Sequence, residues 1–246
     1  MYRFFAPGVD PGDESVALPR AEAEHLTRVL RLGAGDAVSV FDGRGREYLG
    51  RVVSAVGRDV RIALVRPVVA APESAVAMTL AQAVLKSDRM DEVVRDAVML
   101  GVAAIQPIVT RRTETTVAAL TRAGKIDRWQ RVALASVKQS RRAVLPEVRQ
   151  PLTLDVYLEE PGHALSLMLV EPGADAPVTS LAPLQSERRP ADASILVGPE
   201  GGWHEDEWRA ARDRGVRLVT LGHRTLRADA VAVAALSVLD FIWSGA

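Results

Sequence analysis

The sequence predicts a two-domain α/β protein, with a small β-rich domain over residues 1–70 and a larger α/β domain over residues 75–246. The first 70 residues hold short apolar segments separated by Gly/Asp turns, which is typical of strands. A Pro- and Ala-containing stretch, Arg66–Ser74, indicates a linker. After it, strand-like and helix-like segments alternate. A length of 246 residues fits one or two domains, since domains usually hold roughly 100–200 residues.

The first domain is expected to be a small β-barrel, because strands of this length joined by tight turns favour one. Turns are expected at Asp42–Gly45 and Gly57–Asp59. The predicted helix spans Ala21–Leu30, and the predicted strands are Tyr2–Phe5, Ala37–Phe41, Tyr48–Val56 and Val60–Val65.

The second domain is expected to be a parallel sheet covered by helices, because its strands alternate with helices along the chain. The predicted strands are Val76–Ala81, Ala104–Val109, Leu165–Val170, Ser194–Val197 and Val216–Leu221. The predicted helices are Arg89–Leu100, Ala119–Ser140, Glu205–Arg214 and Asp229–Trp243. The last helix is apolar nearly all round, which indicates a buried core helix or, in our interpretation, half of a subunit interface.

Composition excludes several classes of protein. There is no cysteine, which rules out disulfides, zinc-thiolate sites and thiol nucleophiles. The longest apolar stretch, Ala230–Leu239, is interrupted by Ser237 and is too short for a membrane span, which needs about 20 residues. The N-terminus has no signal-peptide pattern. We therefore expect a cytoplasmic protein.

Charge is distributed unevenly, although the formal net charge is zero. Residues 86–150 hold 13 basic and 7 acidic residues, a balance of +6, whereas residues 151–246 hold 8 and 14, a balance of −6. A basic middle beside an acidic end indicates a face for a polyanion. Compositional drift on a solvated surface is an equally good explanation of charge alone.

Two glycine-containing loops are the strongest candidates for a binding site. The segment Ile195–Trp203 runs from an apolar strand through Gly198-Pro199-Glu200-Gly201-Gly202, and Leu221–Ala230 again leaves a strand through glycine. Ligands bind at the carboxyl ends of strands in open α/β sheets, and glycines let a ligand approach the backbone. Neither loop has the order of a dinucleotide or P-loop motif. Plain strand-to-helix connections, with Asp229 as a helix cap, are the alternative.

Two further segments are polar and basic. Lys86–Asp91 lies at a predicted helix start, a natural anion site, although Ser87 or Asp88 there can simply cap the helix. Lys138–Arg142 ends another helix. The four histidines show no metal-ligand spacing, so we expect no metal; the acidic run after His204 fits a helix N-terminus better. There is no G-x-S-x-G motif of a serine hydrolase.

Together these blocks resemble the ribosomal RNA small subunit methyltransferase E family of the SPOUT superfamily. Lys86-Ser87-Asp88-Arg89-Met90-Asp91 is similar to its K-x-D-R-M-E motif, and Gln139-Ser140-x-Arg142 with Pro146-Glu147-Val148 to its Q-S/C-x-R…P-x-I/V segment. Val197–Gly202 matches I/V-G-P-E-G-G, and Leu221–Arg227 matches L-G-x-R-x-L-R. Arg3-Phe4-Phe5 and Glu24–Arg31 resemble its N-terminal domain. The blocks occur in family order over nearly the whole chain.

The resemblance implies a PUA-like β-barrel that helps to hold RNA, followed by a SPOUT domain with a deep trefoil knot. It further implies a homodimer that uses S-adenosylmethionine to methylate N3 of a uridine in 16S ribosomal RNA of the small ribosomal subunit. This chain departs from the family where Ala228-Asp229-Ala230 replaces the usual Thr-Glu-Thr, and where His223 stands at a frequent proline.

Site residues are assigned as expectations in three groups. Uridine N3 carries a proton, so a base or a cation that stabilises the developing anion is required. Arg227 is expected to hold a uracil oxygen or a phosphate, and Asp229 or Glu200 to be the base or to orient Arg227. Capping of the loop and helix is the alternative role for Glu200. Cofactor binding is assigned to Leu169, Glu171, Leu196, Val197, Gly198, Pro199, Gly201, Gly202, Leu221, Gly222 and Leu226. RNA contact is assigned to Arg3, Arg28, Arg31, Lys86, Arg89, Arg111, Arg112, Arg141 and Arg142.

Two other functions stay open at this point. One is a 2′-O-ribose RNA methyltransferase of the same superfamily. The other is a non-catalytic RNA-binding assembly factor that has lost activity through Ala228-Asp229-Ala230, since a fold by itself does not fix function.

Overall fold

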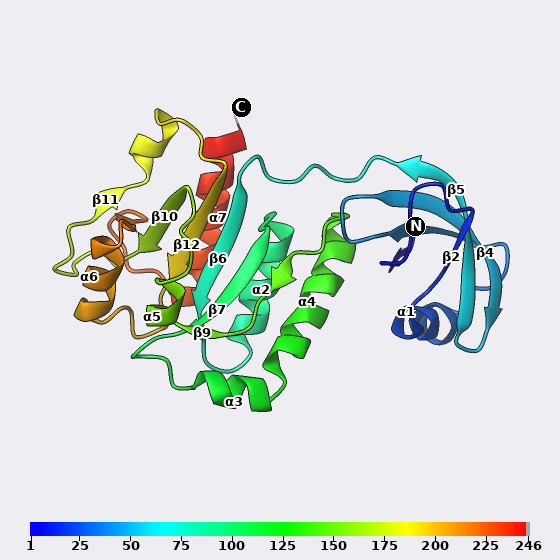
Figure 1. Cartoon of the computed structure of the whole chain (residues 1–246), viewed down its shortest axis with the longest axis horizontal. Coiled ribbons are helices and arrows are strands. Elements are labelled where there is room, and N and C mark those ends of the chain that lie inside the picture. Colours follow the sequence, from blue (N-terminus) through cyan, green and yellow to red (C-terminus); the bar gives the residue numbers. More distant parts are fainter. Residues whose placement is uncertain (245–246) are drawn as a thin grey trace. The chain divides into compact units, whose positions relative to one another are not determined.

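A computed structural model describes residues 1–244, and Figure 1 shows its elements. The chain divides into two compact units. The first unit comprises Met1–Glu73 and Val137–Leu145, and the second comprises Ser74–Ser136 and the chain from Pro146 onward. The Val137–Leu145 segment therefore lies in the first unit, outside the residues 1–70 assigned to that domain from the sequence.

A five-stranded sheet with the order β1-β3-β4-β5-β2 forms the first unit. Strand β1 runs parallel to β3, and the other neighbours are antiparallel. The side chains of Phe4, Leu26, Val40 and Ile62 are fully buried in its core. The strands are β1 (Arg3–Phe5), β2 (Ser15–Ala17), β3 (Ala37–Phe41), β4 (Glu47–Val56) and β5 (Asp59–Val68).

The predicted helix Ala21–Leu30 is present in two pieces. Helix α1 (Arg20–Glu24) continues directly into a π-helical segment, His25–Val29. Strand β5 extends to Val68, so the linker begins later than the expected Arg66.

The Val137–Leu145 segment is held in the first unit by charged side chains. Arg3 donates to the carbonyl oxygens of Val137, Lys138 and Arg142 at 2.7–3.0 Å, and pairs with Glu47 at 2.8 Å. Lys138 Nζ lies 2.5 Å from a carboxylate oxygen of Glu22, which is only 6% exposed. These buried cations are structural.

An eight-stranded sheet, in which every pair is parallel, forms the second unit. Its main path is β11-β13-β10-β12-β6-β7-β8, and β9 also pairs with β7. The strands are β6 (Ala77–Ala83), β7 (Ala104–Val109), β8 (Glu147–Val148), β9 (Leu152–Thr153), β10 (Leu165–Leu169), β11 (Thr179–Ser180), β12 (Asp192–Val197) and β13 (Arg217–Thr220).

Helices cover this sheet, as the alternating pattern predicts. Helices α5 and α6 pack on the strands through Leu154, Tyr157 and Trp208, and α2 contacts α7. The helices are α2 (Arg89–Met99), α3 (Val117–Arg122), α4 (Lys125–Ser140), α5 (Leu154–Tyr157), α6 (Glu205–Asp213) and α7 (Ala228–Ser244), with a 3₁₀ turn at Ala182–Gln185.

One long helix over Ala119–Ser140 was expected, and this prediction is wrong. The segment forms α3 and α4, separated at Ala123 and Gly124, because Gly124 adopts a left-handed conformation with φ of +60°. In the longer of the two helices, α4, the inward-facing side chains of Ile126, Trp129 and Ala133 are buried.

Helix α7 is only partly enclosed. Leu236 and Leu239 are fully buried, whereas Phe241 is 67% exposed and Val238 39% exposed. Within residues 1–244, no helix is both long and apolar enough to cross a membrane. The same residues contain no group of three or more potential metal ligands.

Candidate functional site

A cavity of about 460 Å³ opens at the carboxyl ends of β10, β12 and β13 in the second unit. Three strand-end loops wall it: Leu169–Pro172 after β10, Val197–Trp203 after β12, and Thr220–Ala228 after β13. This is the edge at which parallel sheets bind ligands, and the volume suits a small molecule, whose sites hold about 300–1,000 Å³. The two loops selected from the sequence thus belong to one cavity.

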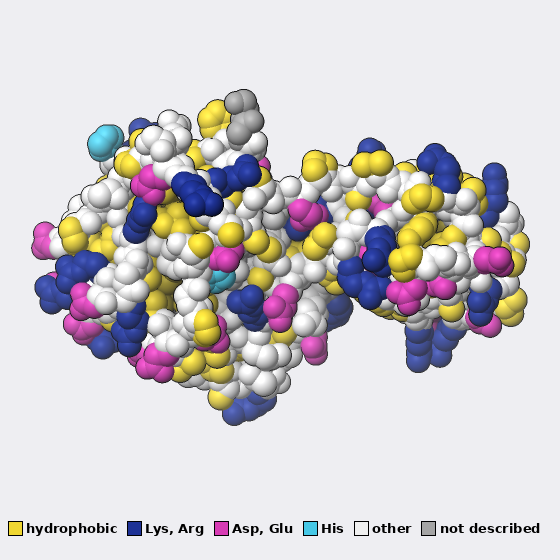
Figure 2. Space-filling view, turned by 45° about the horizontal axis from the view of Figure 1, so that its top comes forward, with side chains coloured by type: hydrophobic (Ala, Val, Ile, Leu, Met, Phe, Trp, Pro, Cys, Tyr) yellow, Lys and Arg dark blue, Asp and Glu magenta, His cyan; other side chains and the backbone are white. Residues whose placement is uncertain are grey.

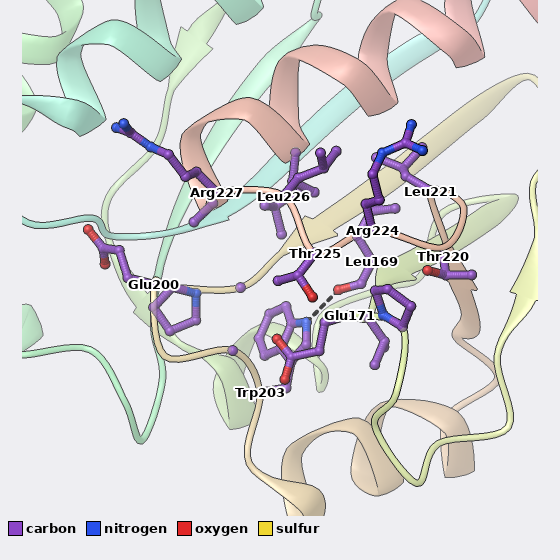
Figure 3. Close-up of a pocket in the computed structure, with 18 of the residues that line it drawn as sticks. Leu169, Glu171, Glu200, Trp203, Thr220, Leu221, Arg224, Thr225, Leu226 and Arg227 are labelled. Atoms are coloured by element: carbon purple, nitrogen blue, oxygen red, sulfur yellow. Dashed lines mark hydrogen bonds between the residues drawn. The ribbon is translucent and has the colours of Figure 1, made fainter.

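Trp203 forms the floor of the cavity and fixes its backbone (Figure 3). Its indole Nε1 donates a buried 2.8 Å hydrogen bond to the Leu169 carbonyl oxygen. A Cβ atom on Gly198 would lie 3.2 Å from the Trp203 ring, and one on Gly202 would lie 2.6 Å from a Glu171 carboxylate oxygen. Gly202 also has a φ of +69°, so glycine is required there both by space and by backbone conformation.

Arg112 and the first turn of α6 brace the loop after β12. Arg112 Nη1 donates to the Gly201 carbonyl at 2.5 Å. His204 caps α6: its ring accepts from the Asp206 amide, while Glu207 accepts from the His204 amide in a reciprocal capping box. The acidic run after His204 is therefore part of a helix start, as the sequence suggested.

Two arginines that line the cavity, Arg227 and Arg89, are paired with carboxylates; Glu200 also lines the cavity, whereas Asp229 does not. Arg227 pairs with Asp229 through two hydrogen bonds of 3.0 and 3.1 Å. Glu200 Oε1 accepts from the Lys86 amide at 3.0 Å and from Arg89 Nη1 at 3.3 Å. In Figure 3, the side chains of Arg227 and Glu200 come from different loops and both extend toward the side opposite Thr220.

The structure brings most of the expected cofactor residues together. Leu196 is excluded from the cavity because it points into the core beneath α6, and Gly201 faces Arg112 instead. Gly222, with a φ of +90°, forms the turn behind Leu221. The expected residues that line the cavity are Leu169, Glu171, Val197, Gly198, Pro199, Gly202, Leu221 and Leu226, together with Glu200 and Arg227.

Several lining residues were not expected. Trp203 and Thr220 directly adjoin the predicted segments, so their positions in sequence were a usable signal. Arg224, Thr225 and Val231 also line the cavity. Arg89, which was assigned to RNA, lines it as well.

The arginines that were expected to bind RNA differ in whether their side chains are exposed or buried. Arg28, Arg31 and Arg141 are exposed. For Arg3 and Arg142 the expectation is corrected. Arg3 is about 10% exposed, with its guanidinium bound to three carbonyls and Glu47, and Arg142 is 4% exposed and paired with Glu73.

The other expected RNA cations are exposed or half-buried but already engaged. Lys86 pairs with Glu114 at 2.5 Å, and this hydrogen bond raises the pKa of Lys86. Arg111 pairs with Asp206 at 2.6 Å. Basic side chains are interspersed with acidic ones on the face in Figure 2 and do not gather into one patch there.

Comparison with known families defines the class of this fold and site. Residues 72–240 match an RNA methyltransferase domain, and residues 18–62 match the PUA domain of RNA methyltransferases. The solved structure of a ribosomal RNA small subunit methyltransferase E from Neisseria gonorrhoeae, bound to S-adenosylmethionine, is similar with a TM-score of 0.87 and 28% identity. The match covers 99% of this chain and 98% of that one. A Legionella pneumophila protein in complex with the same cofactor also matches with a TM-score of 0.87, at 29% identity over 97% of this chain and 96% of that one.

Sequence relatives narrow the class to one family. Ribosomal RNA small subunit methyltransferase E of Synechocystis sp. is 32% identical over 229 residues, which cover 93% of this chain and 73% of the relative. The enzyme of the same name from Mycobacterium tuberculosis is 30% identical, over 90% of this chain and 86% of its own length. The chain belongs to the ribosomal RNA small subunit methyltransferase E family.

Proposed function

We propose that this protein is an S-adenosylmethionine-dependent methyltransferase that methylates N3 of a uridine in 16S ribosomal RNA. The observation that carries the proposal is the cavity itself. The loops after β12 and β13 carry the family motifs and lie far apart in sequence. Together they line one cavity, large enough for a small molecule, at the carboxyl edge of the sheet.

The residues of the cavity fit this cofactor. Gly198 and Gly202 let Trp203 and Glu171 lie close against the backbone of the loop, which shapes the cavity for a ligand. Leu169, Leu221 and Leu226 offer apolar surface to an adenine ring, and the exposed Glu171 carboxylate offers a negative charge to the cationic part of the molecule. When bound, the cofactor supplies an electrophilic methyl group on a sulfonium.

Arg227 and Asp229 are assigned to the substrate side of the cavity. The Arg227 guanidinium holds a uracil oxygen or a phosphate, which favours the N3 anion. Asp229 orients Arg227 through the paired hydrogen bonds described above. Positioning of the cofactor and the uridine supplies the rest of the reduction in the activation barrier. In well-oriented reactions this contribution reaches roughly 7–11 kcal/mol.

Contact with RNA is divided between the units. The first domain holds RNA through the exposed Arg28 and Arg31, and Arg141 adds to this surface. In the second unit the candidates are Lys86, Arg89, Arg111 and Arg112. Contact with a phosphate requires Lys86 and Arg111 to leave their carboxylate partners and Arg112 to leave the Gly201 carbonyl, whereas Arg89 contacts the substrate beside Glu200. Such binding weakens steeply with salt, because phosphate contacts release counterions.

The finer features of the family complete the proposal. The strand order β13-β10-β12-β6, in which consecutive strands are not neighbours, supports a chain threaded as a deep trefoil knot. The partly exposed apolar side of α7, with Val238 and Phe241, supports a homodimer. We place the protein in the cytoplasm, because that is where an enzyme that modifies ribosomal RNA meets its substrate.

The test is methyl transfer from labelled S-adenosylmethionine to small ribosomal subunits that lack the modification, followed by nucleoside mass spectrometry. The expected product is 3-methyluridine. A ribose-methylated product would identify a 2′-O-methyltransferase instead. Cofactor binding without any methylated nucleoside in 16S RNA would contradict the proposal and favour a non-catalytic assembly factor.

A further inference from the structure

Glu200 is engaged in a way that suits a positioning residue. Its Oε1 atom accepts both the Lys86 amide and Arg89 Nη1, so the carboxylate links the loop after β12 to the start of α2. The side chain of Glu200 is 23% exposed and that of Arg89 is 43% exposed. Both hydrogen bonds are accepted by Oε1, which ties the carboxylate to Arg89 and to the backbone of Lys86. A base must direct an oxygen at the proton that it takes, and the variants below distinguish that role from the positioning of Arg89.

Arg89 occupies a position that the helix itself does not favour. It is the first residue of α2, and a cation in the first turn is opposed by the positive end of the helix dipole. The negative charge of Glu200 offsets this unfavourable interaction with the helix dipole, and the ion pair holds the Arg89 guanidinium at the cavity. The arrangement repeats the Arg227–Asp229 pair, which lies on the loop after β13.

The chemistry of uracil explains why a site would hold two such cations. N3 lies between the carbonyl oxygens O2 and O4, and loss of the N3 proton spreads negative charge over both. A single arginine stabilises one oxygen; a second arginine is needed for the other. Prearranged donors directed at developing charge are among the largest contributions to catalysis.

We propose that Arg89 is a catalytic residue that binds one uracil carbonyl oxygen while Arg227 binds the other, and that Glu200 positions Arg89 and is not the general base. This inference rests on the proposed function. The N3 proton leaves to water, the N3 lone pair forms the new N–C bond, and the electron pair of the broken C–S bond stays on sulfur. The uracil anion and the sulfonium thus react to give an N3-methylated uracil and a thioether, both of which are uncharged at the reacting atoms.

Arg224 also lines the cavity but does not have the features that this role requires. Within residues 1–244 it has no carboxylate partner to fix it. In Figure 3 its side chain lies on the side of Thr220 and Leu221, away from Glu200.

The experiment compares Arg89→Ala, Arg89→Lys and Glu200→Gln with the wild-type protein. The matched control is Arg95→Ala, because Arg95 lies on the same helix, pairs with Asp96 and does not line the cavity. We would measure kcat and KM for unmodified small ribosomal subunits from pH 6 to 10, the Kd for S-adenosylmethionine, and the identity of the methylated nucleoside.

The expected result for Arg89→Ala is a loss in kcat of about 10²–10³-fold, the effect of removing one donor to a developing oxyanion. The rising limb of its pH profile moves to higher pH, because the N3 anion is less stabilised. Arg89→Lys recovers part of the rate. Glu200→Gln shifts the limb in the same direction by a smaller amount, and all variants bind the cofactor as the wild type does.

Three results would overturn the inference. A larger loss in Glu200→Gln than in Arg89→Ala, with the rising limb abolished, would make Glu200 the base. A raised KM for subunits in Arg89→Ala, with kcat and the pH profile unchanged, would make Arg89 a plain RNA contact. Absence of 3-methyluridine with the wild-type protein would refute the proposed function, a failure that is seen before any variant is compared.

Discussion

Trp203→Phe tests whether the indole hydrogen bond holds the floor of the cavity. The substitution keeps an aromatic ring but removes the donor to the Leu169 carbonyl, a buried 2.8 Å contact. Leaving a buried acceptor without its partner costs about 1–3 kcal/mol. At about 2–4 °C per kcal/mol for a chain of this size, the melting temperature should fall by roughly 2–12 °C from this loss alone.

Trp208→Phe is the matched control, because Trp208 is equally buried, at 6% against 7% exposure, and no acceptor is found for its indole within residues 1–244. Both substitutions remove similar ring volume, and phenylalanine keeps an aromatic face for Arg209 and Arg212, which lie over the Trp208 ring. The difference between the variants therefore reports mainly the hydrogen bond of Trp203.

The assays are thermal unfolding, which gives the melting temperature, and urea unfolding, which gives the unfolding free energy. Both are followed by far-ultraviolet circular dichroism with and without S-adenosylmethionine. The cofactor stabilises only the unit that binds it, which identifies the relevant transition. Affinity for the cofactor, measured by calorimetry, should fall in Trp203→Phe and be retained in Trp208→Phe. Equal unfolding free energies and equal affinities in the two variants would refute the reasoning.

Three further predictions follow from the same unit. Arg227→Ala should lower methyl transfer by about 10²–10³-fold, the effect of removing one donor to the developing charge, with cofactor affinity unchanged; a fully active variant would contradict its role. Gly202→Ala should lower the unfolding free energy by about 1–2 kcal/mol, because the residue has a left-handed backbone, and should weaken cofactor binding by displacing Glu171. Gly215→Ala is the control, since Gly215 has a φ of +84° and open space around it. It should lose similar stability, and its cofactor affinity in calorimetry should be unchanged. Burial raises the pKa of Tyr157 above 10.0, so the unfolded chain loses this proton first and the unfolding free energy should decline above about pH 10; Tyr157→Phe should remove that part of the decline in pH-dependent denaturation.

Much of the fold could be predicted because its elements have clear local patterns. Strands β3 and β7 have the predicted bounds, Ala37–Phe41 and Ala104–Val109, since each is an apolar run between turn residues. The break at Gly124 was missed because one glycine inside a helical pattern is often tolerated. Strands of two residues, such as β8 and β11, are too short to show any period.

The site was predictable to the extent that glycine marks it. Gly198 and Gly202 identified the loop after β12, and both do make close backbone approaches. The brace from Arg112 to Gly201 joins residues 89 positions apart, and no local pattern signals such a contact. For the same reason Arg3 was assigned to RNA: an arginine in a sequence gives no sign that three distant carbonyls will bury it.

The segment Val137–Leu145 has a consequence for how the protein is made. The ribosome releases residues 1–73 early, yet the cation for Glu22 and the carbonyl partners of Arg3 lie in this later segment. Until it emerges, the nascent first unit lacks both the cation that pairs with Glu22 and the carbonyl oxygens that bind Arg3, so neither charged side chain can be buried at low cost. Completion of the N-terminal unit therefore waits for synthesis of more than half of the chain, when two of the eight strands of the second sheet, β6 and β7, have already been made.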